Sequence, residues 1–207
     1  MTFDTLITEF DKGLRTLFAQ AHSQRAHPDA GVADAELSPA EKRHALGLMR
    51  VNHCGEICAQ ALYQGQALTA RDEAARDKLR EAAQEEVEHL AWTERRIREL
   101  GGRPTLLGPL WYTGSLAIGI TAGVLGDKWN LGFLEETEHQ VGAHLDSHLR
   151  QLPEQDAKSR AIVQQMRDDE LRHADMAHNF GAASLPKPIK RLMTLSAKAM
   201  TASTYRL

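Results

Sequence analysis

Hydrophobic residues recur at helical spacing through most of the chain. Near the start they stand three or four residues apart, at Phe3, Leu6, Ile7, Phe10, Leu14, Leu17 and Phe18. This spacing predicts an amphipathic helix over residues 3–22. Residues 23–37 are rich in Ser, His, Pro, Asp, Gly and Ala, which is typical of a loop. We therefore expect residues 1–37 to form an N-terminal helix and loop.

The segment 39–100 is predicted to form a hairpin of two long helices, over about 39–69 and 72–100. The start of the first helix is marked by Ser38 as N-cap, with Glu41 three residues later to complete a capping box. Two glycines and a nearby proline then follow the second helix, which is a common way for a helix to end.

A second hairpin is predicted over residues 128–180. Its helices are expected over about 128–151 and 154–180, because Pro153 makes a natural break between them and Gly181 follows the second. Helix-forming residues dominate the chain and aromatic residues make up only 5% of it. The pattern as a whole predicts an all-α protein built on four long helices.

Each hairpin carries one glutamate on its first helix and a Glu-x-x-His motif on its second. These residues are Glu56, Glu86 and His89 in the first hairpin, and Glu138, Glu170 and His173 in the second. The midpoints between the paired glutamates fall at residues 71 and 154, where the turns are expected. Two Glu and two Glu-x-x-His are the ligand set of di-iron and di-manganese carboxylate bundles.

The residue types suit a site for two hard divalent cations. Three positions along a helix place a Glu and a His on one face. Carboxylate oxygens with some imidazole nitrogen favour iron or manganese over zinc or copper. One imidazole per metal leaves coordination positions open for O₂. The alternative is that both hairpins expose solvated faces that are rich in glutamate.

Glu-x-x-His alone is a weak signal, because it also occurs at Glu41/His44 and Glu136/His139. Glu41 already has a capping role, far along the helix from Glu56. Glu136 and His139 flank Glu138, but choosing them would remove the glutamate that stands opposite Glu170. We therefore place Glu136 and His139 on the outer face.

Several residues near these motifs are candidates for supporting roles. Metal-bound histidines usually donate their second N–H to a neighbouring group, for which Asp175 and His144 are candidates. Tyr63 lies on the same helix face as Glu56 and is expected either to line a substrate channel or to fill the core. Cys54 and Cys58 stand about 200° round the helix from Glu56 and are expected to be small core residues.

Residues 104–126 contain no charged side chain. The run is nearly as long as the ~20 apolar residues that cross a bilayer, but a crossing would put the two hairpins on opposite sides of the membrane. The segment is therefore predicted to be a long apolar crossover between the hairpins. It would either be buried as a helix or present a surface that sits on or in one leaflet.

No acidic residue follows Asp175, and residues 184–207 mix Lys and Arg with apolar side chains. This basic amphipathic tail suits an anionic membrane surface, and equally suits a solvated helix packed on the bundle. The chain has 207 residues, enough for a single domain, and its net charge of -3 gives no reason to expect nucleic acid as a partner. Two cysteines and no signal-peptide pattern indicate a reducing, cytoplasmic setting.

About residues 39–207 resemble the demethoxyubiquinone hydroxylase family. The resemblance rests on three motifs: Arg50-Val51-Asn52-His53-x-Gly55-Glu56 with Tyr63-x-Gly65-Gln66; Glu86-x-Glu88-His89-Leu90; and Asp169-Glu170-Leu171-x-His173-x-Asp175. The sequence departs from the family at Cys54 and Cys58, where small non-thiol residues are usual, and at Ala174, where some members have a second histidine. None of these positions is a predicted ligand.

The resemblance implies a ferritin-like four-helix bundle and O₂-dependent hydroxylation of a demethoxyubiquinol ring. It implies two iron ions per chain, held by the six residues of the two hairpins, with O₂ as co-substrate and an external reductant. The expected partners are a polyprenyl quinol, the membrane surface, and either other ubiquinone-biosynthesis proteins or a second copy of the chain. The expected location is peripheral, on the cytoplasmic face of the cell membrane.

Two functions of other classes compete with this interpretation. A ferritin-like iron-storage or ferroxidase protein would use the same ligands, although the apolar segment 104–126 argues against a soluble storage shell. A membrane-docking scaffold without chemistry would bind no stoichiometric metal.

Overall fold

The computed structural model describes residues 3–207, so that residues 1–2 of the predicted N-terminal segment lie outside the described part. The described residues form seven α-helices and no strand. The helices are α1 (Phe3–Phe18), α2 (Pro39–Thr69), α3 (Glu73–Glu99), α4 (Gly108–Val124), α5 (Asp127–Gln151), α6 (Ala157–Asn179) and α7 (Lys187–Thr204). The all-α prediction is confirmed.

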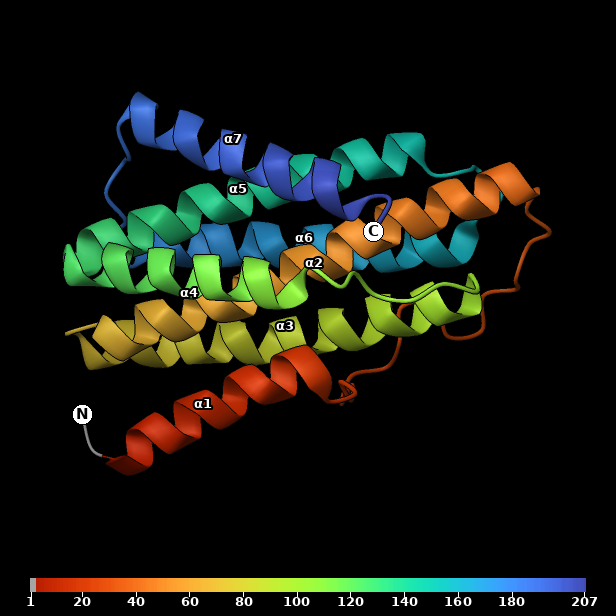
Figure 1. Ribbon diagram of the computed structural model, residues 1–207. Coiled ribbons are helices and arrows are strands. Elements are labelled where there is room, and N and C mark those ends of the chain that lie inside the picture. Colours follow the sequence, from red (N-terminus) through yellow and green to blue (C-terminus); the bar gives the residue numbers. More distant parts are fainter. Residues whose placement is uncertain (1–2) are drawn as a thin grey trace.

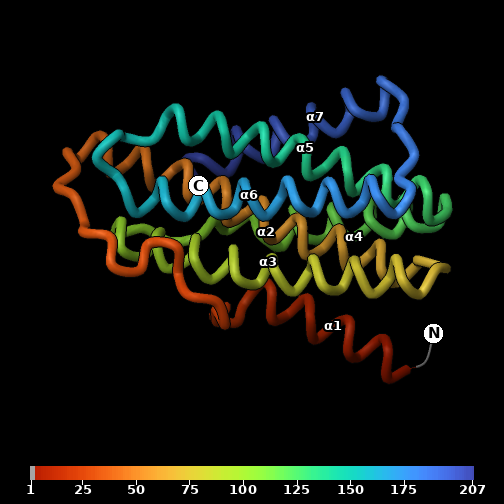
Figure 2. The backbone as a smooth tube through the Cα atoms, turned by 180° about the vertical axis from the view of Figure 1, so that it is seen from behind, coloured from red at the N-terminus to blue at the C-terminus, as the bar shows by residue number. Residues whose placement is uncertain are grey.

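Four long helices, α2, α3, α5 and α6, lie side by side along a common axis (Figure 1). α2 packs on α3 and α5 packs on α6, as the two predicted hairpins require. α4 crosses from one hairpin to the other and lies along α2, while α1 and α7 lie on the outside of the bundle (Figures 1 and 2). The arrangement is a four-helix bundle with a crossover and two additional helices, as predicted.

Side-chain caps determine where several helices begin. The capping box at the start of α2 is present, since Ser38 and Glu41 each accept a hydrogen bond from the backbone of the other. α6 begins three residues later than predicted because Asp156 caps it, with its carboxylate accepting from the N–H of Ser159 at 3.1 Å. α1 ends at Phe18 rather than at residue 22.

The apolar segment 104–126 forms α4, which contacts α2 backbone to backbone. A Cβ atom on Gly119 would lie 2.4 Å from the carbonyl oxygen of Leu62, and one on Gly65 would lie 2.6 Å from the backbone nitrogen of Ile120. Only glycine permits this approach. The opposite side of α4 exposes large apolar residues such as Leu110 and Ile118. None of the described helices combines the length and hydropathy that a membrane crossing requires.

The core has one large apolar cluster towards each end of the bundle. One contains Met49, Trp92 and Met166, and the other contains Leu79 and Leu134. The glutamates and histidines of the two hairpins occupy positions between these clusters in the sequence of each helix. The polar layer is therefore enclosed by apolar packing at both ends.

Candidate metal centre

The six side chains predicted as ligands meet in one buried cluster at the centre of the bundle. α2 contributes Glu56, α3 contributes Glu86 and His89, α5 contributes Glu138, and α6 contributes Glu170 and His173. None of the six is more than 4% exposed. Charged groups buried to this extent need a partner of opposite charge or a metal ion.

His89 directs Nδ1 towards the carboxylates of three helices. The distances from this nitrogen are 2.9 Å to Glu86 Oε2, 3.4 Å to Glu170 Oε1 and 3.6 Å to Glu56 Oε2. These four residues each offer one ligand atom within 4.8 Å of the others. They form the first of two groups with ligand-like geometry.

The second group consists of Glu138, Glu170 and His173 and meets the same distance criterion. His173 Nδ1 lies 3.4 Å from Glu170 Oε2 and also 3.4 Å from Glu86 Oε1. Glu170 belongs to both groups, and Glu86 reaches towards both histidines. The two groups are therefore adjacent, and carboxylates lie between them.

Three polar atoms at the meeting point of the groups have no hydrogen-bond partner. They are Glu86 Oε1, Glu170 Oε2 and His173 Nδ1, and all three are buried. Native proteins leave few such atoms unsatisfied, and each unsatisfied atom needs an explanation. A cation at this point would satisfy all three, and the carboxylate-rich donor set suits iron or manganese. The residues present therefore fit a two-metal centre.

Burial raises the pKa of Glu56 well above its ordinary value, and the charge of Glu86 raises it further. Burial also raises the pKa of Glu138, with Glu170 as the next contribution. For Glu86, the neighbouring histidines overcome the effect of burial and lower its pKa. In the absence of a cation, protons would thus occupy part of the cluster. Binding of a metal ion would release them.

Tyr63 is a direct neighbour of the cluster. Its hydroxyl donates a hydrogen bond to Glu138 Oε1, and its side chain is fully buried against the second apolar cluster. Burial raises the pKa of this phenol well above its usual value, so the hydroxyl keeps its proton. Of the two roles expected for Tyr63, the structure shows packing in the core together with a polar contact to the site.

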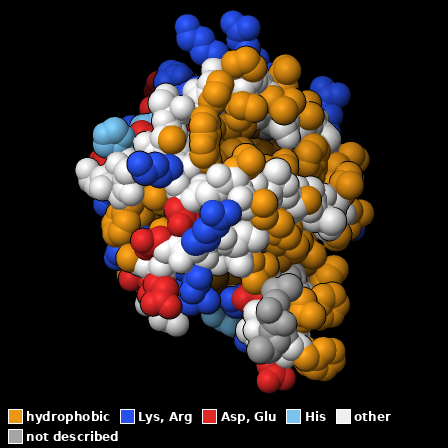
Figure 3. Space-filling model, turned by 90° about the vertical axis from the view of Figure 1, so that its left-hand side faces the viewer, with side chains coloured by type: hydrophobic (Ala, Val, Ile, Leu, Met, Phe, Trp, Pro, Cys, Tyr) orange, Lys and Arg blue, Asp and Glu red, His pale blue; other side chains and the backbone are white. Residues whose placement is uncertain are grey.

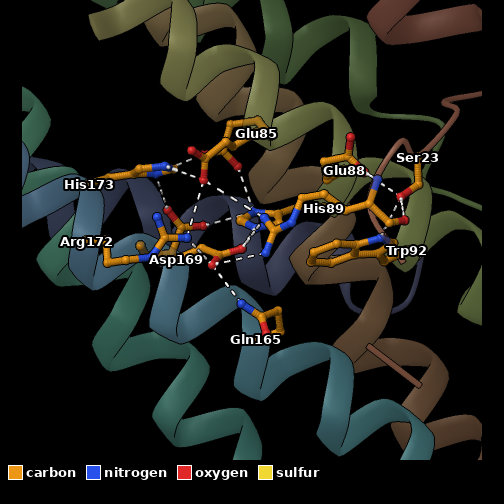
Figure 4. A network of polar contacts seen from close by, with 12 residues as sticks. Ser23, Glu85, Glu88, His89, Trp92, Gln165, Asp169, Arg172 and His173 are labelled. Atoms are coloured by element: carbon orange, nitrogen blue, oxygen red, sulfur yellow. Dashed lines mark hydrogen bonds and ion pairs between the residues drawn. The ribbon is translucent and has the colours of Figure 1, made fainter. Parts of the chain in front are cut away.

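The histidines are oriented from behind by carboxylates other than the one predicted. His89 Nε2 lies 3.0 Å from Asp169 Oδ2, and His173 Nε2 lies 3.3 Å from Glu85 Oε2 (Figure 4). The prediction of Asp175 was wrong, because that residue points to solvent from the outer side of α6.

The prediction of His144 was also wrong. Its ring lies against that of His148, with ring centroids 4.0 Å apart, on the α5 side of the bundle. It contacts neither histidine of the cluster. Asp169 was missed as a partner of His89, although it immediately precedes Glu170. The packing of α3 against α6 decides which face of α6 reaches His89, and the sequence does not show this packing.

The competing motif on α5 faces outwards, as predicted. Glu136 forms an ion pair with Lys190 of α7 at 2.5 Å, and the side chain of His139 is exposed. Cys54 is buried and Cys58 is partly buried, in agreement with small core residues. Neither thiol belongs to the groups with ligand-like geometry.

Comparison with known proteins agrees with this geometry. Residues 43–204 match the family described as ubiquinone biosynthesis protein COQ7. The chain is 78% identical over 204 residues to the 3-demethoxyubiquinol 3-hydroxylase of Chromobacterium violaceum, with 99% of each chain covered. It is 64% identical over 206 residues to the enzyme of the same name from Dechloromonas aromatica, with both chains fully covered. The motif resemblance is confirmed, and the chain belongs to the family of ubiquinone biosynthesis protein COQ7.

Proposed function

We propose that this protein hydroxylates the ring of a demethoxyubiquinol in ubiquinone biosynthesis, with O₂ as co-substrate and two iron ions as cofactor. The observation that carries this proposal is the buried cluster of four glutamates and two histidines, three of whose polar atoms make no hydrogen bond. The relatives of the chain support the substrate and the reaction, because they are named 3-demethoxyubiquinol 3-hydroxylases.

Each iron would be held by one of the two groups. Glu56, Glu86 and His89 would hold one ion, while Glu138 and His173 would hold the other, with Glu170 within reach of both. Bound iron would supply the activation of O₂. The protein would contribute fixed ligand positions and a layer from which the apolar clusters on either side exclude water.

A cleft of about 620 Å³ lies between α1, α2 and α3. This volume lies in the range of small-molecule sites, which is about 300–1,000 Å³. Tyr63 lines the cleft and at the same time donates to Glu138. We propose that the substrate ring approaches through this cleft. Before the ring binds, the phenol of Tyr63 would stand between the cleft and Glu138.

The polyprenyl tail of such a substrate requires contact with a bilayer. Large hydrophobic side chains are exposed mainly on three helices: Phe3, Leu6, Ile7, Phe10, Leu14 and Phe18 on α1; Leu110, Ile118, Ile120 and Val124 on α4; and Ile189, Leu192 and Leu195 on α7. Figure 3 shows hydrophobic side chains gathered along one side of the molecule in the end view. We propose that this side rests on the cytoplasmic face of the cell membrane, where the basic residues of α7 meet anionic lipids.

Replacing the glutamate that both groups share tests this function. Glu170→Ala should abolish iron loading and hydroxylation of a demethoxyubiquinol, whereas the wild type should bind about two irons per chain. Glu136→Ala is the matched control, because it disrupts the outward-facing Glu-x-x-His motif. Turnover retained by the Glu170→Ala variant would refute the proposal. A large hollow assembly with many irons per chain would instead favour the iron-storage alternative.

A further inference from the structure

The loop between α1 and α2, residues 19–38, is fastened to α3 beside the metal centre. Figure 2 shows this segment running over α3 on its way to the start of α2. Glu88, the residue before His89, accepts hydrogen bonds from the hydroxyl of Ser23 and from the backbone N–H groups of Gln24 at 3.0 Å and Arg25 at 3.1 Å. Trp92 also donates to Ser23 Oγ at 3.0 Å. One carboxylate thus holds three consecutive residues of the loop.

This attachment places the side chain of Arg25 on Asp169. The guanidinium lies over the ring of Trp92, 4.9 Å from its centroid, and Nη1 donates to Asp169 Oδ2 at 2.8 Å. The carboxylate of Asp169 is completely buried. The same oxygen, Oδ2, lies 3.0 Å from His89 Nε2. A continuous chain of contacts therefore runs from Glu88 through the loop and Asp169 to a predicted metal ligand.

We infer that Arg25 is a positioning residue of the metal centre: the loop, fastened by Glu88, holds Arg25 on Asp169, and Asp169 in turn fixes the imidazole of His89. This inference rests on the proposed function, since it concerns the same two-metal site. Arg25 would be a residue of the metal centre that lies outside the four-helix bundle and outside residues 43–204, the segment that matches the family.

The two oxygens of Asp169 have largely different partners, and the shortest contact of Arg25 is with Oδ2; its Nη2 also lies 3.5 Å from Oδ1. Oδ1 is held from within α6, by Gln165 at 2.8 Å and by Arg172 (Figure 4). Oδ2, which faces His89, receives its charged hydrogen bond from Arg25. Without Arg25, Arg172 is the cation that remains next to Asp169, so the carboxylate of Asp169 can rotate towards it. The Nε2 side of His89 would then lose its fixed partner.

Loss of a group that orients a metal-bound histidine typically costs 10- to 100-fold in metal affinity. We therefore expect Arg25→Ala to weaken the binding of Co²⁺, used alone as the probe, by about 10- to 100-fold. Arg25→Lys, which keeps the charge, should restore part of this loss. The measurement is a titration of the metal-free full-length protein, followed by the visible absorption of bound Co²⁺.

Glu88→Ala provides the sharper test, because the hydrogen bonds of the Glu88 side chain go to the loop and not to Asp169 or any predicted ligand. It should weaken Co²⁺ binding as much as Arg25→Ala does, and the double variant should show no further loss. Hydrogen exchange at the amides of Gln24 and Arg25 should accelerate in Glu88→Ala. Arg98→Ala is the matched control, because Arg98 is an exposed arginine of α3 that pairs with Glu94, and it should leave the affinity unchanged.

The outcomes separate this inference from the proposed function. A wild-type protein that binds no Co²⁺ would refute the two-metal site and the inference with it. A wild type that binds Co²⁺, together with Arg25→Ala and Glu88→Ala variants that bind it equally tightly, would overturn the positioning role alone. Losses that add independently in the double variant would also overturn it, because the loop would then not act through Arg25.

Discussion

At the scale of single residues, the imidazole of His89 is held from both sides, because Nδ1 faces the carboxylates of three helices and Nε2 faces Asp169. The spacing of Glu86 and His89 places both on one face of α3 in any regular helix, so this pairing could be predicted. The partner of His89 on α6 depends on the packing of two helices far apart in the sequence. Asp169 and Asp175 are equally plausible until that packing is known. This explains why the sequence pointed to the wrong aspartate.

Tyr63→Phe should destabilise the metal-free protein by about 1–3 kcal/mol, because Glu138 Oε1 then loses a buried hydrogen bond. A bound metal ion would give Glu138 another partner, so the destabilisation caused by Tyr63→Phe should be smaller when iron is present. Urea unfolding with and without Fe²⁺ measures both values. Tyr112→Phe is the control, since its hydroxyl bonds Gln64 away from the site and its loss should not depend on metal. Equal losses with and without iron for Tyr63→Phe would count against the site.

At the scale of elements, hydrophobic periodicity predicts well that the long helices exist. It predicts their first and last residues less well. The ends depend on side-chain caps such as Asp156, which no periodic pattern contains. The apolar segment 104–126 was recognisable as a crossover between hairpins. Its close contact with α2 could not be predicted, because the glycines involved become meaningful only when the two helices are placed side by side.

Gly119→Ala should destabilise the protein by more than about 2 kcal/mol or move α4 away from α2, because the new Cβ would meet the backbone of Leu62 at 2.4 Å. Gly114→Ala on the same helix meets no atom within 4 Å and should be neutral or stabilise by up to about 1 kcal/mol. Thermal unfolding of the two variants makes the comparison. Equal stability of both would show that α4 does not contact α2 in this way.

At the scale of the whole molecule, burial couples stability to pH outside the metal centre. Burial lowers the pKa of His148 to about 3 and that of His53 to about 4, both below the ordinary value of 6.5. Below pH 6.5 these two histidines become protonated in the unfolded chain but stay neutral in the folded protein. Each histidine therefore contributes stability at neutral pH that is lost as the pH falls from about 6.5 towards its folded pKa.

His148→Gln should remove one of these contributions. Between pH 6 and pH 4, the free energy of unfolding of the variant should fall less steeply than that of the wild type, by about 1.4 kcal/mol per pH unit. The pH dependence of the unfolding free energy decides the test. A difference between variant and wild type that is the same at every pH would come from packing alone. Urea unfolding at several pH values measures it. Parallel curves would mean that His148 titrates normally in the folded protein.

The all-α architecture and the six clustered residues were predictable because helical period and hairpin symmetry operate over long stretches. The central claim is that these residues hold two metal ions, and X-ray diffraction at the iron absorption edge from crystals loaded with Fe²⁺ tests it most directly. We predict two anomalous peaks, one beside Glu56 and His89 and the other beside Glu138 and His173. A cluster without iron, or a single peak outside it, would contradict the claim.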